Sequence, residues 1–113
     1  MSNEQLMVVS AVTEVSSAVN SLITSYRGSR IVNRMKLRIA EEKIRGCISI
    51  QRSQVIGEVG RTNLIELQKT MNMLNDMNLQ GPMADYAMMT VESMAEGLVR
   101  ILEDLKNEYR QSV

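Results

Sequence analysis

Two stretches of this chain repeat an apolar residue at alternating intervals of four and three positions, and this spacing constrains the fold more than any other feature. The first stripe is Val8, Val12, Val15, Val19, Leu22 and Tyr26. The second stripe is Ala87, Val91, Met94, Leu98, Ile101 and Leu105. Because these intervals match the turn of an α-helix, each stripe lies on one helix face. The pattern predicts two long helices, over residues 3–26 and 82–110, whose apolar faces pack against other helices.

Glycine, proline and capping residues predict where the helices begin and end. Arg27 and Gly28 indicate the end of the first helix, and Pro82 occupies a favoured first position of the last one. A further helix is expected to open with Thr62 as its N-cap and to end before Gly81. Its apolar residues are Leu64, Leu67, Met71 and Leu74, at intervals of three, four and three.

Residues 29–60 allow two interpretations. A helix is expected to start after Ser29 and to extend beyond residue 50. The stretch 46–60 is rich in isoleucine, valine and glycine, a composition that is also typical of a short β-hairpin. Gly57 and Gly60 would weaken any helix that passes through them. The sequence therefore leaves open whether residues 46–60 are helix or hairpin.

Length and composition fit a single helical domain over residues 1–113. The chain has 113 residues, 44% of them hydrophobic, and contains ten methionines but no phenylalanine or tryptophan. The core must therefore be aliphatic and filled by methionine, which suits closely packed antiparallel helices. We predict an all-α fold, an antiparallel three- or four-helix bundle with coiled-coil-like seams. The seams span about three heptads, which favours a compact oligomeric bundle over a fibre.

Charge is distributed unevenly along the chain although the net charge is zero. Residues 27–52 hold eight of the thirteen basic residues and only two of the thirteen acidic ones. Placed at about 100° per residue on a helix, five arginines of this segment fall within about 40° of one direction. This predicted arginine ridge consists of Arg30, Arg34, Arg38, Arg45 and Arg52. Guanidinium groups form paired hydrogen bonds with phosphate or carboxylate, so an acidic partner is one interpretation of the ridge.

Two other interpretations of the arginine ridge stay open. The arginines can simply be solvated, or they can pair with acidic residues inside the bundle or across an oligomer. Nucleic acid is the alternative partner, but the zero net charge, Glu41 within the ridge and the absence of phenylalanine and tryptophan oppose it. We therefore expect the ridge to orient a protein partner, with a nucleic-acid-binding protein as the alternative function.

Seven of the ten methionines lie between residues 71 and 94 and form a second candidate contact surface. Met71 and Met94 lie on apolar stripes and are expected in the core, whereas Met73, Met83 and Met88 fall outside the stripes. Methionine is flexible and polarisable, which suits either gap-filling in the core or a surface that docks partner helices. The first helix is included in this contact surface because serine, threonine and asparagine replace charges on its other faces. This favours a helix that is covered on both sides, by the rest of the bundle or by a second copy, and a solvated serine-rich face is the alternative. The predicted apolar partner-binding residues are Val8, Val12, Val15, Val19, Met73, Met77, Met83, Met88 and Met89.

Enzymatic chemistry has few candidate residues in this chain. Without histidine, and with Cys47 as the one cysteine, the chain lacks histidine-based catalytic arrangements and zinc sites built on several cysteines. Cys47 lies between Gly46 and Ile48, which predicts buried packing rather than a reactive thiolate. We predict no catalytic residue, no metal, no cofactor and no small-molecule substrate.

The predicted location is the cytoplasm. The first residues are acidic and broken by polar side chains, unlike the start of a secretory signal, and no apolar run reaches the ~18 residues of a membrane span. The predicted function is non-enzymatic: a helical protein–protein interaction module such as an adaptor, a binding chaperone or an assembly subunit. This module would form a homo-oligomer and would dock a protein partner through its methionine- and valine-rich helix faces.

Overall fold

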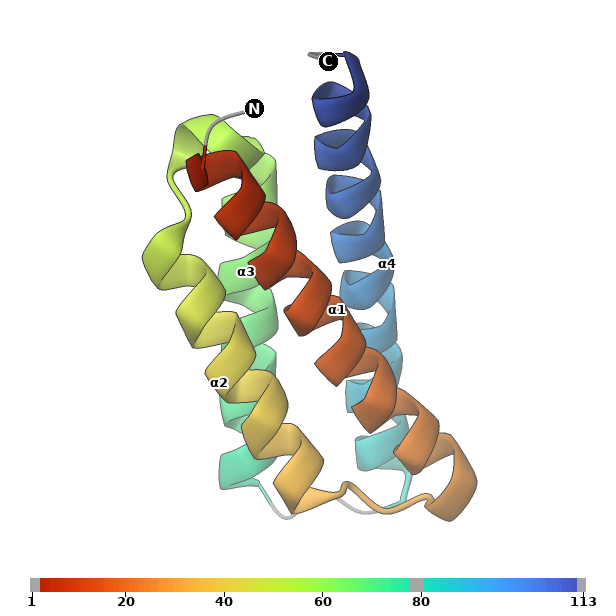
Figure 1. Ribbon diagram of the computed structural model, residues 1–113. Helices are drawn as coiled ribbons and strands as arrows, with labels where there is room; N and C mark the ends of the chain where they lie inside the picture. The colour runs from red at the N-terminus through yellow and green to blue at the C-terminus, as the bar shows by residue number, and fades with distance from the viewer. Residues whose placement is uncertain (1–2, 78–80, 112–113) are drawn as a thin grey trace.

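Four antiparallel helices form the structure. The computed structural model describes residues 3–77 and 81–111, with α1 (Asn3–Ser29), α2 (Arg34–Ile50), α3 (Ser53–Asp76) and α4 (Pro82–Gln111). α1 packs against α2 and α4, and α3 packs against the same two helices, so the four surround one core (Figure 1). The predicted all-α bundle is confirmed, with four helices, and the described ranges contain no strand.

The two apolar stripes of the sequence form much of this core. The first stripe, from Val8 to Tyr26, is buried along the whole of α1, and in the second stripe Val91 and Leu98 are fully buried. α2 and α3 complete the core with Leu37, Ala40, Ile44, Cys47, Leu64, Leu67, Met71 and Leu74. Apart from Tyr26, the described core side chains are aliphatic or contain sulfur, because the sequence has no phenylalanine or tryptophan.

The first helix is longer than predicted. α1 continues through Arg27 and Gly28 to Ser29, and the chain leaves the helix at Arg30, which has a φ of 58°. The Arg30 N–H donates a hydrogen bond of 2.6 Å to the carbonyl oxygen of Tyr26, which closes the last helical turn. The residue that follows the helix and adopts a left-handed backbone conformation, commonly a glycine, is therefore Arg30. Gly28, which the sequence indicated as the helix end, keeps a helical backbone.

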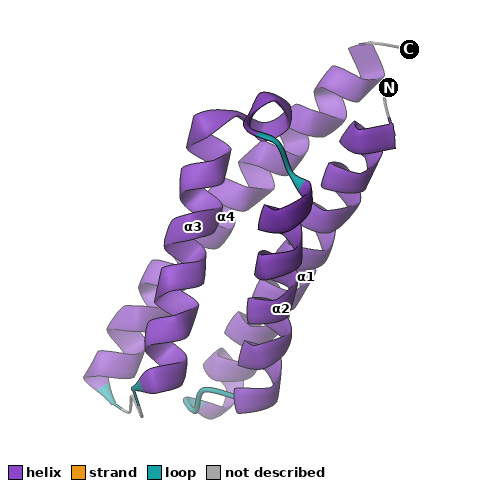
Figure 2. Ribbon diagram, turned by 90° about the vertical axis from the view of Figure 1, so that its left-hand side faces the viewer, coloured by secondary structure: helices purple, strands orange, loops and turns teal. Residues whose placement is uncertain are grey.

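The third helix begins nine residues before the predicted N-cap. Residues 46–50 end α2 and residues 53–60 begin α3, so the hairpin interpretation of 46–60 is wrong, and Thr62 lies inside α3. Gly57 interrupts α3 with a φ of 71° and a ψ of 175°, so the first turn stands at an angle to the rest of the helix (Figure 2). The glycines and valines that resemble a strand in sequence therefore mark a bend in a helix.

The alternating helix directions give the bundle two distinct ends. The loop end carries the α1–α2 and α3–α4 connections, and the terminal end carries the α2–α3 connection and both chain termini (Figure 1). Between these ends α3 and α4 approach closely at Gly97, where a β-carbon would collide with the side-chain amide of Asn63. Gly97 is therefore needed for the close contact between these two helices.

Candidate functional site

The four valines predicted to bind a partner lie in the core instead. Val8, Val12, Val15 and Val19 each have none of their surface exposed, because α2 and α4 cover the face of α1 that carries them. Their spacing predicted an apolar contact face correctly, but that face contacts the other helices of the same chain. The prediction that these valines bind a partner is therefore corrected: they belong to the core of the bundle.

The predicted methionine surface divides into one buried and four exposed residues. Met88 is only 4% exposed and packs in the core, so its prediction as a contact residue is corrected, whereas its neighbour Met89 is 67% exposed. Met73, Met77 and Met83 are also exposed. Met73 lies in the last turn of α3, Met77 directly follows that helix, and the first turns of α4 carry Met83 and Met89, which places all four near the loop end.

Further apolar residues at the loop end were missed in the sequence. Among the described residues twelve large apolar side chains are exposed, and eight of them belong to this half of the bundle. We call these eight the methionine-rich end: Ile31, Met35, Ile39, Met73, Met77, Met83, Tyr86 and Met89. Met73, Tyr86 and Met89 lie outside the apolar stripes that the sequence displays, whereas the sequence displays no stripe for residues 31–39.

Polar contacts between α1 and α4 neutralise the charges near this end. The Tyr26 hydroxyl donates a hydrogen bond of 2.6 Å to Asp85 Oδ1, and Arg30 Nη1 lies 3.3 Å from the same oxygen. One turn further along, Arg27 forms an ion pair with Glu92. Burial raises the pKa of Tyr26, and the hydrogen bond and negative charge of Asp85 raise it further. These groups border a depression of about 320 Å³ whose apolar lining includes Met89.

The predicted arginine ridge is shorter than five residues. Arg30 lies in the α1–α2 connection and Arg52 in the α2–α3 connection, because α2 spans only residues 34–50. Arg52 pairs with Glu4 of α1 at 3.0 Å, and Arg34 Nη1 donates to the carbonyl oxygen of Asn75 at 2.6 Å. Three of the five guanidinium groups thus hold the chain's own helices and connections together.

Arg38 and Arg45 of the ridge are exposed on α2, on either side of Glu41. Glu41 is half-buried and its Oε1 atom accepts no hydrogen bond from the described residues. Burial raises the pKa of this carboxyl, while the positive charge of Arg45 opposes the rise. An acidic residue therefore lies between the two arginines, which reduces the positive field that they present outward.

Cys47 is buried in the core, with 1% of its surface exposed. Burial raises the pKa of its thiol to about 11, so the folded protein carries little thiolate at neutral pH. No group of three metal-binding side chains occurs in the part of the chain that the structure describes.

We expect Cys47 to react slowly with an aromatic disulfide reagent at pH 8. The pKa of about 11 alone leaves on the order of 100-fold less thiolate than an ordinary cysteine has. The measurement is the rate of thiol modification in native buffer and in concentrated urea, where the thiol should react rapidly. The Cys47 thiol also ionises at a lower pH in the unfolded chain than in the folded protein. The free energy of unfolding should therefore fall as the pH rises from about 9 towards 11. Equal rates in the two buffers would show an accessible thiol and contradict this assignment.

α1 is also long and apolar enough to cross a membrane, by length and composition alone. Its most apolar window of 18 residues has a mean hydropathy of 1.5, and 44% of that window lies buried inside the structure. The core helix of a soluble protein meets the same criterion. The apolar stripe of α1 is accounted for by its contacts with α2 and α4, and the absence of a membrane span stays a prediction.

Comparisons with known proteins give no relative for this chain. No protein-family model, curated protein or solved structure matches it. The proposal for its function therefore rests on the surface of this chain.

Proposed function

We propose that this chain is a non-enzymatic helical interaction module that self-associates and docks a partner protein through the methionine-rich end. The observation that carries this proposal is the concentration of exposed large apolar side chains, eight of twelve, in one half of the bundle. Single exposed apolar residues are ordinary, but a concentration of them at one end of a small bundle favours an interface there. An adaptor, a binding chaperone and an assembly subunit all fit such a module.

The chemistry of the methionine-rich end favours a protein as its occupant. Methionine side chains adopt many shapes at low energetic cost, so they can pack against helices of varied sequence. Asp85 and Glu92 beside them are already paired with Arg30 and Arg27. On the side formed by α1 and α4, an apolar partner would therefore cover Asp85 and Glu92 as ion pairs. Burying either carboxylate as an isolated charge would oppose binding.

The nucleic-acid alternative receives less support from the same surface. Phosphate binding requires several free cationic groups, since each contact releases counterions. Arg30, Arg34 and Arg52 already bond within the chain, and Glu41 lies between the other two arginines of the ridge. We therefore assign Arg38 and Arg45 to orienting a protein partner, through charge that acts mainly on specificity and association rate.

Replacing Met83 and Met89 together with glutamine tests this proposal. We expect wild-type protein to sediment above the mass of one chain at micromolar concentration, and the double variant to dissociate at least about tenfold more readily. The physical reason is the loss of two apolar side chains that an interface would bury, each contributing ~1.5 kcal/mol or more. Sedimentation velocity over a concentration series measures the change.

The matched control replaces Leu6 and Met7 with glutamine at the terminal end. These residues are also exposed apolar side chains, at 46% and 56%, so the chemical change is similar. We expect this control to associate like wild type. Wild type, the control and the Met83→Gln/Met89→Gln variant are then each purified from the native cell. A partner protein should co-purify with wild type and with the control, but not with the variant. A wild-type monomer at every concentration, or equal losses in both variants, would contradict the proposal.

A further inference from the structure

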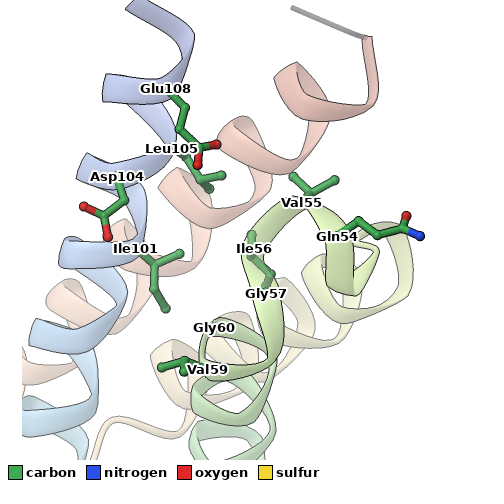
Figure 3. Close-up of a pocket in the computed structure, with 10 residues that line it drawn as sticks. All are labelled: Gln54, Val55, Ile56, Gly57, Val59, Gly60, Ile101, Asp104, Leu105 and Glu108. Carbon is green, nitrogen blue, oxygen red and sulfur yellow. The ribbon is translucent and has the colours of Figure 1, made fainter. Parts of the chain in front are cut away.

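A second apolar groove lies at the opposite end of the bundle, between the start of α3 and the last turns of α4. It has a volume of about 350 Å³ and is open to solvent along one side. Its residues are Gln54, Val55, Ile56, Gly57, Val59 and Gly60 of α3, with Ile101, Asp104, Leu105 and Glu108 of α4. Figure 3 shows Ile101 and Leu105 on one wall and Ile56 on the other.

The groove exists because α3 and α4 separate beyond their close contact at Gly97. At Gly97 the side chain of Asn63 fills the space that a β-carbon would occupy, which holds the two helices together. One turn closer to the terminal end, a β-carbon at Gly60 would lie against the side chains of Ile56 and Ile101, so the lack of a side chain at Gly60 leaves space between the two helices. The bend at Gly57 then turns the first turn of α3 away from the helix axis, which leaves the groove uncovered.

The walls of the groove are apolar and partly uncovered. Val55, Ile56 and Ile101 are half-buried, Leu105 is buried below them, and Val59 at the edge is 82% exposed. Val59 and the three half-buried aliphatic side chains expose apolar surface to water, and a bound ligand would remove this surface from water. An apolar side chain of another molecule could therefore be buried in this groove.

Two carboxylates border the groove on the α4 side. Asp104 and Glu108 are one helical turn apart and both are exposed (Figure 3). Neither forms an ion pair with a described basic residue, whereas Glu4, Glu14, Asp85 and Glu92 all do. None of the described residues that line the groove is basic. The described rim of the groove is thus negative, which favours a cationic occupant.

We propose that this groove binds a basic amphipathic helix of another protein. Its apolar side chains would enter between Val59 and Leu105, and its lysines or arginines would reach Asp104 and Glu108. A helix is the occupant that we assign, because the groove lies between two helices and is open to solvent, and amphipathic helices bind in apolar grooves of this kind. A small molecule would stay largely in water in an open groove, whereas small-molecule sites bury most of the ligand surface. This site is separate from the methionine-rich end and does not depend on self-association.

A synthetic helical peptide made only of leucine and lysine serves as the probe. A length of about fourteen residues gives ~21 Å of helix, enough to span the groove. We expect the labelled peptide to bind the full-length protein in a fluorescence-anisotropy titration at low salt. A peptide with glutamate in place of every lysine should not bind. Binding of both peptides with equal affinity would overturn the role of charge in the proposal.

The groove variant combines Asp104→Asn with Glu108→Gln and should weaken binding of the leucine–lysine peptide about five- to tenfold. Its matched control combines Glu96→Gln with Glu103→Gln, which removes the same charge from α4 outside the groove lining. We expect less than about a twofold change for this control when the titration is repeated at about 0.15 M salt, because charge outside the groove lining is then screened over about 8 Å. Equal losses in the two variants would show non-specific attraction and overturn the proposal.

Methyl-group NMR locates the peptide without any substitution. Binding in the groove should shift the methyl signals of Val55, Ile56, Ile101 and Leu105. Shifts confined to the methionine-rich end, or no binding at all, would overturn this assignment. Sedimentation of the groove variant should match that of wild type, so failure of this proposal and failure of the proposed function remain distinguishable.

Discussion

Replacing Val15 with asparagine is expected to lower the free energy of unfolding by about 3–5 kcal/mol. Val15 has none of its surface exposed and lies at the middle of the apolar stripe of α1. The substitution removes a buried aliphatic side chain and places an amide among apolar neighbours without a hydrogen-bond partner. Urea denaturation followed by circular dichroism measures the loss, which is large for a domain of this size.

The control for this prediction is Met7→Asn on the same helix. Met7 is 56% exposed, so asparagine there should change the free energy of unfolding by no more than about 0.5 kcal/mol. A Val15→Asn protein as stable as wild type, but unable to associate, would restore the valine stripe as a partner surface. The pair of variants thus separates a core face from a contact face on one helix.

The second large effect is expected for Gly57→Ala, which should lower the free energy of unfolding by about 1–3 kcal/mol. Gly57 has a φ of 71° and a ψ of 175°, a backbone conformation that is open to glycine and strained for every L-amino acid with a side chain. A β-carbon at this position would meet no other atom within 4 Å. The cost therefore comes from the backbone alone, and chemical denaturation measures it.

Gly46→Ala is the matched control because the same substitution should act in the opposite direction. Gly46 lies inside α2, keeps a helical backbone, and a β-carbon there would also meet no other atom within 4 Å. Alanine should raise the free energy of unfolding by about 0.5–1 kcal/mol, because alanine favours the helix more than glycine does. If Gly57→Ala were neutral or stabilising, α3 would be a continuous helix through residue 57.

The core was predictable from regular residue spacing, whereas the start of α3 and the end of α1 depend on unusual backbone angles that the sequence does not display. The stripes of α1 and α4 depend on intervals within one helix, which the sequence displays directly. The start of α3 depends on a bend at Gly57, and a glycine in a sequence does not reveal which φ it adopts. The end of α1 depends on a left-handed arginine, Arg30, where glycine is the usual residue.

The surface was less predictable because it depends on contacts between distant residues. Met88 and Met89 are neighbours in sequence, yet one packs in the core and the other faces solvent. Arg34 bonds to Asn75, 41 positions away, which removes it from a ridge that the helical repeat alone predicts. Residue spacing identifies a helix face, but only the arrangement of all four helices decides whether that face meets water.

The hydrogen bonds around Asp85 bear on the proposed binding of a partner protein at the methionine-rich end. Asp85 joins Tyr26, in the last turns of α1, to the first turn of α4 and also contacts Arg30. The backbone that carries Met83 and Met89 is therefore fixed to its neighbour before any encounter. Little backbone freedom is left to lose on association, so the adjustment to a partner's shape falls to the thioether side chains. If the proposed partner binding holds, a fixed backbone with flexible methionine side chains would accept helices of different sequence without a change in fold.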